Sequence, residues 1–185
     1  MHDQQFPRLR VYLTLWVTLA ELANLVWEHF NGGVVIHHIM DRSDMPAVSN
    51  WWSGLLIPVL TWFLMGRIQA RIVLHSDGEQ AASRLSAVVA AGFVGSLLFG
   101  ILISVSFTSG YEALSSFLFP SMVLLALIFP GYRAECVLGF VLGMTFTFGA
   151  VLPAAVGSLI AIVSAVIHLW IRPVLVQLWS RFKRA

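Results

Sequence analysis

The chain has 185 residues, of which 58% are hydrophobic and 11% charged, and its mean hydropathy is +0.84. An ordinary soluble domain carries charge on about 25% of its residues, so this composition excludes that class. The net charge of +2 is small, and we expect no nucleic-acid partner.

Long apolar runs predict a polytopic all-α membrane protein. Several runs of about 18 or more residues have almost no charge, and a helix of that length crosses a ~30 Å hydrocarbon core. The runs are continuous rather than alternating, which disfavours a transmembrane barrel. We therefore expect a single transmembrane helical domain over residues 1–185, built as a compact bundle of six helices with short loops. The predicted helices cover about 11–30, 51–71, 82–107, 112–129, 135–151 and 153–179.

The first predicted helix has a polar face. Thr14, Thr18, Glu21, Asn24 and Glu28 recur at intervals of three or four residues, which places them on one side. At ~1.5 Å per residue, Glu21 would lie near the middle of the membrane and Glu28 near its outer boundary. An ionisable group at mid-membrane depth costs about 2.5–3.5 kcal/mol, so Glu21 should face the bundle interior or water. Two interpretations remain: a proton or cation path through Glu21, Asn24 and Glu28, or a structural carboxyl bonded to a neighbouring helix.

The one long outer connection, residues 31–50, begins at Gly32-Gly33, where paired glycines interrupt the first helix. If residues 34–44 form a short helix at the membrane interface, helical spacing places ligand-type side chains on one face. They are His37, Asp41 and Asp44 at i, i+4 and i+7, with His38 next to Asp41. Histidine nitrogens and carboxylate oxygens suit a divalent metal, with zinc favoured.

Met40 and Met45 add soft sulfur ligands beside these histidines, which makes copper possible as the metal. A metal at this site would activate water, and Glu28 would act as the general base. The same residues also fit a hydrated loop that faces lipid headgroups, or a surface that binds a partner.

The later helices contain small residues at packing intervals. The pairs four residues apart are Ser96 with Gly100, Gly139 with Gly143, and Ala161 with Ala165. Small residues at this spacing let helix backbones approach closely. We expect them to pack helices within one bundle rather than to form a dimer face.

Three ionisable residues of the later helices have interpretations that need no catalytic or transport role. Glu112 and Glu135 begin predicted helices, where a carboxylate is stabilised by the positive end of the helix dipole. His168 lies about one turn from Arg172, and we interpret it as a packing or interfacial group rather than a proton relay.

The basic residues indicate the orientation. With six helices and the N-terminus inside, ten of the eleven Lys and Arg residues lie on the inner side and only Arg42 lies outside. The ten are Arg8, Arg10, Arg67, Arg71, Arg84, Arg133, Arg172, Arg181, Lys183 and Arg184. We expect a multi-pass protein of the cytoplasmic (inner) membrane, with both termini in the cytoplasm and residues 31–50 on the outer face.

Three functions fit these observations. The first is a metal-dependent hydrolase that acts on a lipid or a lipid-linked substrate at the outer face. The second is a small proton or metal-cation transporter or channel that uses Glu21 and Glu28. The third is a non-enzymatic accessory subunit of a larger membrane complex. The sequence leaves open whether the chain is an enzyme, and the expected partners are membrane lipid and either another membrane protein or a second copy.

Overall fold

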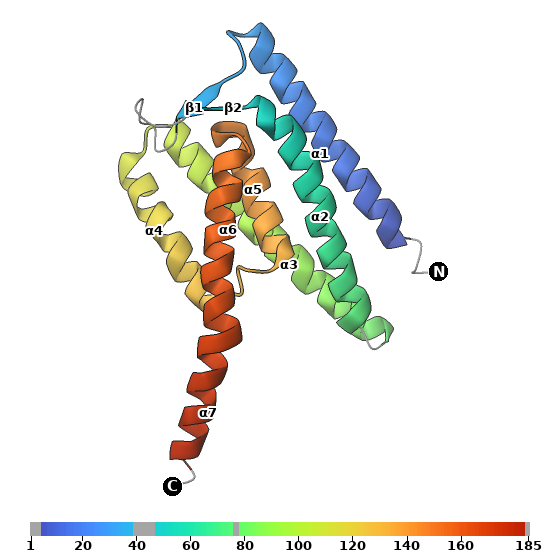
Figure 1. Cartoon of the computed structure of the whole chain (residues 1–185), viewed down its shortest axis with the longest axis vertical. Coiled ribbons are helices and arrows are strands. Elements are labelled where there is room, and N and C mark those ends of the chain that lie inside the picture. Colours follow the sequence, from blue (N-terminus) through green and yellow to red (C-terminus); the bar gives the residue numbers. More distant parts are fainter. Residues whose placement is uncertain (1–4, 39–46, 76–77, 184–185) are drawn as a thin grey trace.

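The structure is a computed structural model that describes residues 5–38, 47–75 and 78–183. This part of the chain is almost entirely helical, which confirms the predicted all-α class (Figure 1). The helices are α1 (Gln5–Phe30), α2 (Trp51–His75), α3 (Glu79–Thr108), α4 (Glu112–Ile128), α5 (Ala134–Phe148), α6 (Val151–Val166), the π-helical turn η3 (Ile167–Ile171) and α7 (Arg172–Phe182).

Successive helices run up and down the bundle, with α6, η3 and α7 forming one continuous rod (Figure 1). Four helical stretches are long and apolar enough to cross a membrane, namely Arg8–Phe30, Trp51–His75, Glu79–Thr108 and Val151–Arg181. The apolar helices α4 and α5 are shorter, with 17 and 15 residues. The six predicted helices therefore all form. Most of their ends lie close to the expected ones, because glycine, proline and polar residues interrupt the apolar runs. The exceptions are α1, which begins at Gln5 rather than about residue 11, and α2, which ends at His75 rather than about residue 71.

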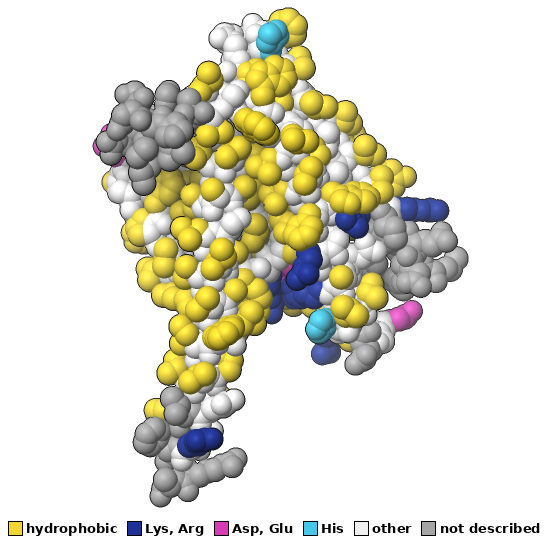
Figure 2. Space-filling model, in the orientation of Figure 1, with side chains coloured by type: hydrophobic (Ala, Val, Ile, Leu, Met, Phe, Trp, Pro, Cys, Tyr) yellow, Lys and Arg dark blue, Asp and Glu magenta, His cyan; other side chains and the backbone are white. Residues whose placement is uncertain are grey.

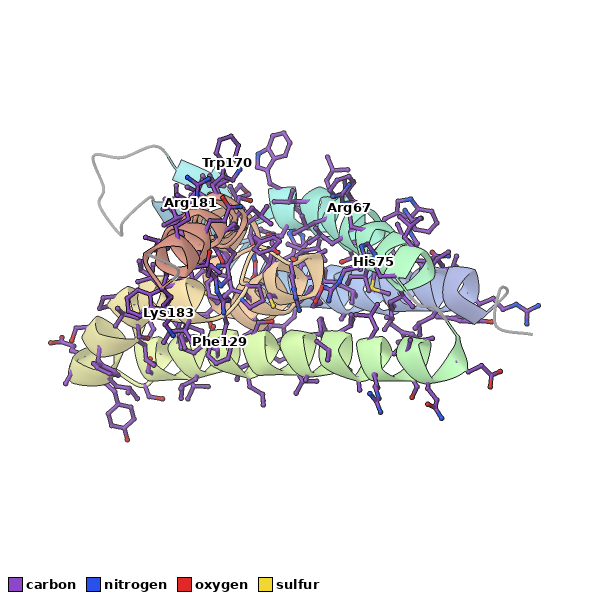
Figure 3. The ribbon with its side chains drawn as sticks, turned by 90° about the horizontal axis from the view of Figure 1, so that it is seen from below. Arg67, His75, Phe129, Trp170, Arg181 and Lys183 are labelled. Carbon is purple, nitrogen blue, oxygen red and sulfur yellow. The ribbon has the colours of Figure 1, made fainter. Side chains whose placement is uncertain are left out.

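Helix α5 is the centre of the bundle. Seen from below, α3 lies on one side of it and α2 and α6 lie on the other (Figure 3). Phe140, Val141 and Met144 of α5 are buried together with Ile57 of α2 and Ile103 of α3. A short helix can occupy this position because its neighbours, rather than lipid, cover its side chains.

The contact between α3 and α5 depends on the predicted small residues. A methyl group at Gly139 would overlap the hydroxyl of Ser96 and the backbone of α3, and one at Gly100 would come within 2.8 Å of the Phe140 carbonyl oxygen. Ser104 Oγ donates a hydrogen bond of 3.1 Å to the carbonyl of Gly143 across the same contact. The prediction that small residues pack helices within the bundle is confirmed for Ser96 with Gly100 and for Gly139 with Gly143. For Ala161 with Ala165 it stays a prediction.

Helices α3 and α4 diverge from the turn that joins them (Figure 1). Gly110 in this turn has a φ of +71°, a conformation that favours glycine. From there α4 runs beside α6, where Ser164 Oγ donates a hydrogen bond of 3.0 Å to the carbonyl of Ala126. The divergence leaves a space between α3 and α4 that α5 only partly fills.

The outer connection is not helical where the structure describes it. Strand β1 (Ile36–His38) pairs antiparallel with β2 (Ala47–Ser49), with His37 opposite Val48 and His38 opposite Ala47. The expected short interfacial helix is therefore wrong over residues 36–38. The β-branched run Val34-Val35-Ile36 explains this result, because such residues favour an extended backbone.

Candidate functional site

The carboxylate of Glu28 lies in a polar network at the end of the bundle that holds strands β1 and β2, the end that the sequence predicts to be the outer one. Its Oε1 accepts hydrogen bonds from the side-chain amides of Asn24 (3.2 Å) and Asn50 (2.7 Å), and its Oε2 accepts one from the backbone N–H of Val35 (3.2 Å). Both carboxylate oxygens are therefore occupied. The geometry gives Glu28 a structural role in joining the end of α1 to the start of α2, and its role as a general base stays a prediction.

The same network continues into the core. Asn50 is 2% exposed, and its Oδ1 accepts a hydrogen bond of 2.6 Å from the hydroxyl of the fully buried Ser53. Ser53 Oγ in turn accepts a hydrogen bond of 2.7 Å from the backbone N–H of Ala150, the residue before α6. We call Asn24, Glu28, Asn50 and Ser53 the outer polar network. It connects α1, α2 and α6, and Asn50 contributes far more than the helix cap that its position suggests.

The predicted metal site lies only partly within the described residues. His37 and His38 belong to β1, whereas Asp41 and Asp44 lie outside the described residues. Among the side chains that the structure describes, no group of three or more His, Cys, Asp and Glu could hold a metal ion. The zinc or copper site stays a prediction.

Glu21 is buried, as its expected inward orientation requires, with 6% of its surface exposed. Within the described part of the chain its Oε1 has no hydrogen-bond partner, and neither has the buried hydroxyl of Thr61 on α2. The hydroxyls of Thr14 and Thr18 donate to backbone carbonyls one turn earlier on α1, at 2.8 and 2.6 Å. The two threonines of this polar face are therefore bonded within α1. The predicted ion path through Glu21 stays a prediction.

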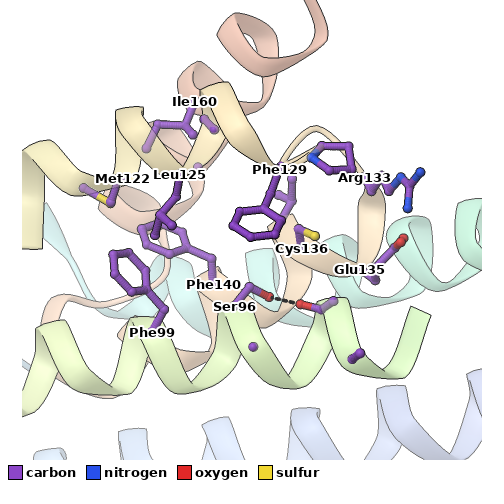
Figure 4. A pocket seen from close by; sticks show the side chains of 18 of the residues that line it. Ser96, Phe99, Met122, Leu125, Phe129, Arg133, Glu135, Cys136, Phe140 and Ile160 are labelled. Carbon is purple, nitrogen blue, oxygen red and sulfur yellow. Dashed lines mark hydrogen bonds between the residues drawn. The ribbon is translucent and has the colours of Figure 1, made fainter. Parts of the chain in front are cut away.

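A cavity of about 520 Å³ lies between α3, α4, α5 and α6 (Figure 4). Most of its wall is apolar. Phe99, Met122, Leu125, Phe129, Phe140 and Ile160 form the wall, together with alanine, valine and glycine residues. The cavity exists because α3 and α4 diverge and because Gly92 and Gly95 place no side chain on that face of α3.

The charged residues of this cavity gather at the end where α5 begins. Arg133, Glu135 and Cys136 lie there, opposite Gly92 of α3 (Figure 4). Glu135 is 1% exposed, and its Oε1 forms a salt bridge with Arg71 of α2. Its other oxygen, Oε2, has no hydrogen-bond partner among the described residues. The residues Arg133, Glu135 and Cys136 are called the charged end of the cavity.

His168 lies beside the connection that closes this end. Its Nδ1 is 3.0 Å from the carbonyl oxygen of Ser164, and its ring centre is 6.1 Å from that of Tyr132. It sits in the π-helical turn η3, which interrupts the predicted helix 153–179. Its Nε2 is buried without a hydrogen-bond partner among the described residues, so its interpretation as a packing group stays a prediction.

Sequence reasoning missed the cavity and assigned Glu135 no role beyond the helix dipole. The partner of Glu135 is 64 residues away, and nothing in the spacing of Arg71 and Glu135 links them. The available signal was Gly95 on α3, a glycine inside a helix at which a Cβ would meet no atom within 4 Å.

Comparison with known proteins adds no further assignment: no protein-family model, no curated protein and no solved structure matches this chain.

Proposed function

We propose that the chain is a multi-pass protein of the cytoplasmic membrane with six spans and both termini in the cytoplasm. The four long apolar helices support this, as does the wide apolar surface around the middle of the molecule (Figure 2). The visible Lys and Arg side chains gather towards the end that holds the chain termini (Figures 1 and 2). A positive-inside arrangement has this distribution.

The protein, in this proposal, binds a membrane amphiphile in the cavity between α3, α4, α5 and α6. The observation that carries the proposal is the cavity itself, about 520 Å³ of mostly apolar space with its charges at one end. Cavities that bind small molecules have volumes of roughly 300–1,000 Å³ and a few polar groups that fix orientation. An acyl or isoprenoid chain would lie against the apolar wall, with its head at Arg133.

The position of the charged end, together with the proposed orientation, supports an amphiphile from the inner leaflet. Arg133 precedes α5, at the end of the bundle opposite to the outer polar network (Figure 1). The proposed binding site and the strands β1 and β2 therefore lie at opposite ends of the molecule. The cavity supports lipid binding as a function of its own, and it does not supply the substrate site that a hydrolase of the outer face would need.

Filling the cavity tests this function. A Cβ at Gly95 would meet no atom within 4 Å, so Gly95→Phe places a ring in the cavity without a backbone clash. We expect the purified variant to retain less than half of the lipid that the unchanged protein retains, as measured by native mass spectrometry. Val94→Leu is the matched control, because Val94 is the adjacent α3 residue, is 48% exposed and does not line the cavity. Equal lipid retention by all three proteins would overturn the proposal.

A further inference from the structure

We propose that α7 binds the surface of an anionic lipid bilayer, with its apolar side in the interface and its cations at the lipid phosphates. The chain bends at the π-helical turn η3 to bring α7 into this position. The inference rests on the proposed membrane insertion, and it is independent of the cavity and of what the cavity binds.

The rod formed by α6, η3 and α7 is longer than a membrane is thick. The stretch Val151–Arg181 has 31 residues, which at ~1.5 Å per residue is about 46 Å against a hydrocarbon core of ~30 Å. A tilt of up to about 40° would absorb only part of this difference. Helix α6 and η3 alone have 16 and 5 residues, which together suffice to cross. The 11 residues of α7 therefore lie beyond the membrane-spanning part.

The contacts of η3 agree with a membrane boundary at the start of α7. The ring of His168 in η3 is 6.1 Å from that of Tyr132, and Tyr132 precedes Arg133, the N-cap of α5. Arg172 begins α7 one turn after His168. The first residue of α7 thus lies close to the level of the proposed inner headgroups, and Figure 1 shows α7 projecting past the ends of α2 and α3.

One side of α7 is apolar and exposed. Every α7 side chain that the structure describes is exposed, including Val174 at 54%, Leu175 at 60% and Trp179 at 67%. At 3.6 residues per turn, these three residues share one side of the helix. The other side consists of Gln177 and Ser180, together with Pro173 and Val176. Because apolar surface is driven out of water, the side with Leu175 and Trp179 favours contact with an apolar phase.

Cations border the apolar side of α7 on both of its edges. Around the helix, Arg172 and Lys183 lie next to Trp179, and Arg181 lies next to Val174. The Nζ of Lys183 is 5.8 Å from the centre of the Trp179 ring. A helix with this arrangement lies in the plane of a membrane interface, with its apolar side towards the acyl chains and its cations at anionic headgroups. Tryptophan is itself enriched at that depth.

The charges favour lipid over a second copy of the chain as the occupant of this side. The sequence from Arg172 to Lys183 contains three cations and no aspartate or glutamate. Pairing α7 with its own copy would bring six cations together without a carboxylate between them, and like charges repel. An anionic lipid surface supplies the opposite charge and an apolar phase at the same place.

The turn η3 provides the point at which the rod can bend. Sharp bends in helices occur at π-helical turns and at prolines. Pro173 directly follows η3 at the start of α7 and has no backbone N–H, which removes one bond from the helical ladder. Both features lie after α6, so α7 can turn onto the membrane while α6 keeps its packing against α4 and α5.

Fluorescent probes on the two sides of α7 test the inference on the full chain in lipid nanodiscs. Cys136 is the one cysteine, so a Cys136→Ser background lets Leu175→Cys or Ser180→Cys carry a single probe. The discs contain phosphatidylcholine with about 30% phosphatidylglycerol, which gives an anionic surface. We expect iodide in the water to quench the probe at position 175 about threefold less than at position 180, because the apolar side of an interfacial helix lies ~5–10 Å deep. Lipids with a nitroxide on the acyl chain should quench position 175 more.

Two outcomes would overturn the position of α7. Equal iodide quenching at both positions would mean that α7 projects into water. Protection of position 175 from iodide without quenching by the nitroxide lipids would mean that a protein, rather than lipid, covers the apolar side. In either case a chain that has entered the discs retains the proposed membrane insertion, whereas a chain that does not enter them rejects both proposals.

The charge requirement has its own test. Arg181→Gln should lower the ratio of docked to free α7 about fivefold on an anionic surface, which raises iodide quenching at position 175. Arg67→Gln is the matched control, because Arg67 is an exposed cation of α2 and lies outside α7. Discs of phosphatidylcholine alone should also raise the quenching. Equal protection with and without phosphatidylglycerol would reject the anionic lipid as the partner.

Discussion

Glu28 and Glu135 are two carboxylates near opposite ends of the bundle. They differ in the number of hydrogen-bond donors that surround them. Glu28 accepts three hydrogen bonds, from Asn24, Val35 and Asn50, over both of its oxygens. Glu135 is more deeply buried, yet only one of its oxygens has a partner within the described residues. Both oxygens of Glu28 are bonded to groups of the protein, whereas one oxygen of Glu135 has no partner among the described residues.

The two carboxylates differ in the donors that the protein supplies to them. Residue type and place along a helix do not separate the two, because both are acids at helix ends. What separates them is whether the protein supplies a donor to each carboxylate oxygen. The cavity between α3 and α4 adjoins Glu135, and the outer polar network does not line it.

The largest loss of stability is expected for Glu135→Ala. Glu135→Ala leaves Arg71, which is 24% exposed, without its salt-bridge partner beside the buried core. Removing one partner of a buried ion pair costs about 3–5 kcal/mol, and we expect the lower part of that range because Arg71 retains some access to solvent. The free energy of unfolding in mixed detergent micelles measures the loss.

Two further variants control this experiment. Glu112→Ala removes an exposed acid from the first turn of α4, where a carboxylate contributes about 0.3–1 kcal/mol through the helix dipole. Arg71→Ala combined with Glu135→Ala should recover part of the loss, because no unpaired charge remains. If Glu135→Ala costs no more than Glu112→Ala, the salt bridge does not stabilise the bundle.

A substitution in the outer polar network should lower the stability less than Glu135→Ala does, and it should not affect the cavity. Glu28→Ala leaves two amide groups and one backbone N–H without their acceptor, at a cost of about 1–3 kcal/mol. Lipid retention should stay unchanged, because Glu28 is remote from the cavity. Glu79→Ala, at the exposed start of α3, is the matched control. A loss of bound metal with no loss of stability would contradict the structural role and favour the predicted metal site.

The sequence predicted the helices well because each one is a continuous apolar run ended by residues that break helices. The fourth predicted helix, 112–129, differs from α4 (Glu112–Ile128) by one residue. The outer segment was predicted less well. Histidine and aspartate spacing suggested a helix, but the β-branched residues before His37 form the start of a hairpin. Local preference for an extended backbone therefore decided the structure of residues 36–38.

The candidate site could not be read from the sequence for a different reason. The cavity depends on the angle between α3 and α4 and on the absence of side chains at Gly92 and Gly95. Apolar helices that face both lipid and protein have no periodic pattern that tells one surface from the other. The pairing of Arg71 with Glu135 depends on the packing of α2 against α5, which no local feature of either helix predicts.

Glu21 is a third carboxylate to compare with Glu28 and Glu135. Its substitution should change the free energy of unfolding least. It is buried like Glu135, and its Oε1 has no partner in the described part of the chain, but it does not line the cavity. Glu21→Gln keeps the shape and one acceptor oxygen, and polar contacts between membrane helices average about 0.6 kcal/mol. We therefore expect the free energy of unfolding to change by no more than about 0.6 kcal/mol, with lipid retention unaltered.

Proton flux into liposomes is a second measurement for Glu21→Gln. If Glu21 only packs α1 against α2, liposomes with the unchanged protein and with Glu21→Gln will show the same flux as empty liposomes. Flux that requires the unchanged residue would instead identify Glu21 as a station on an ion path. In that case the buried carboxyl oxygen of Glu21, which has no partner among the described residues, would mark a binding site for a proton or cation in α1.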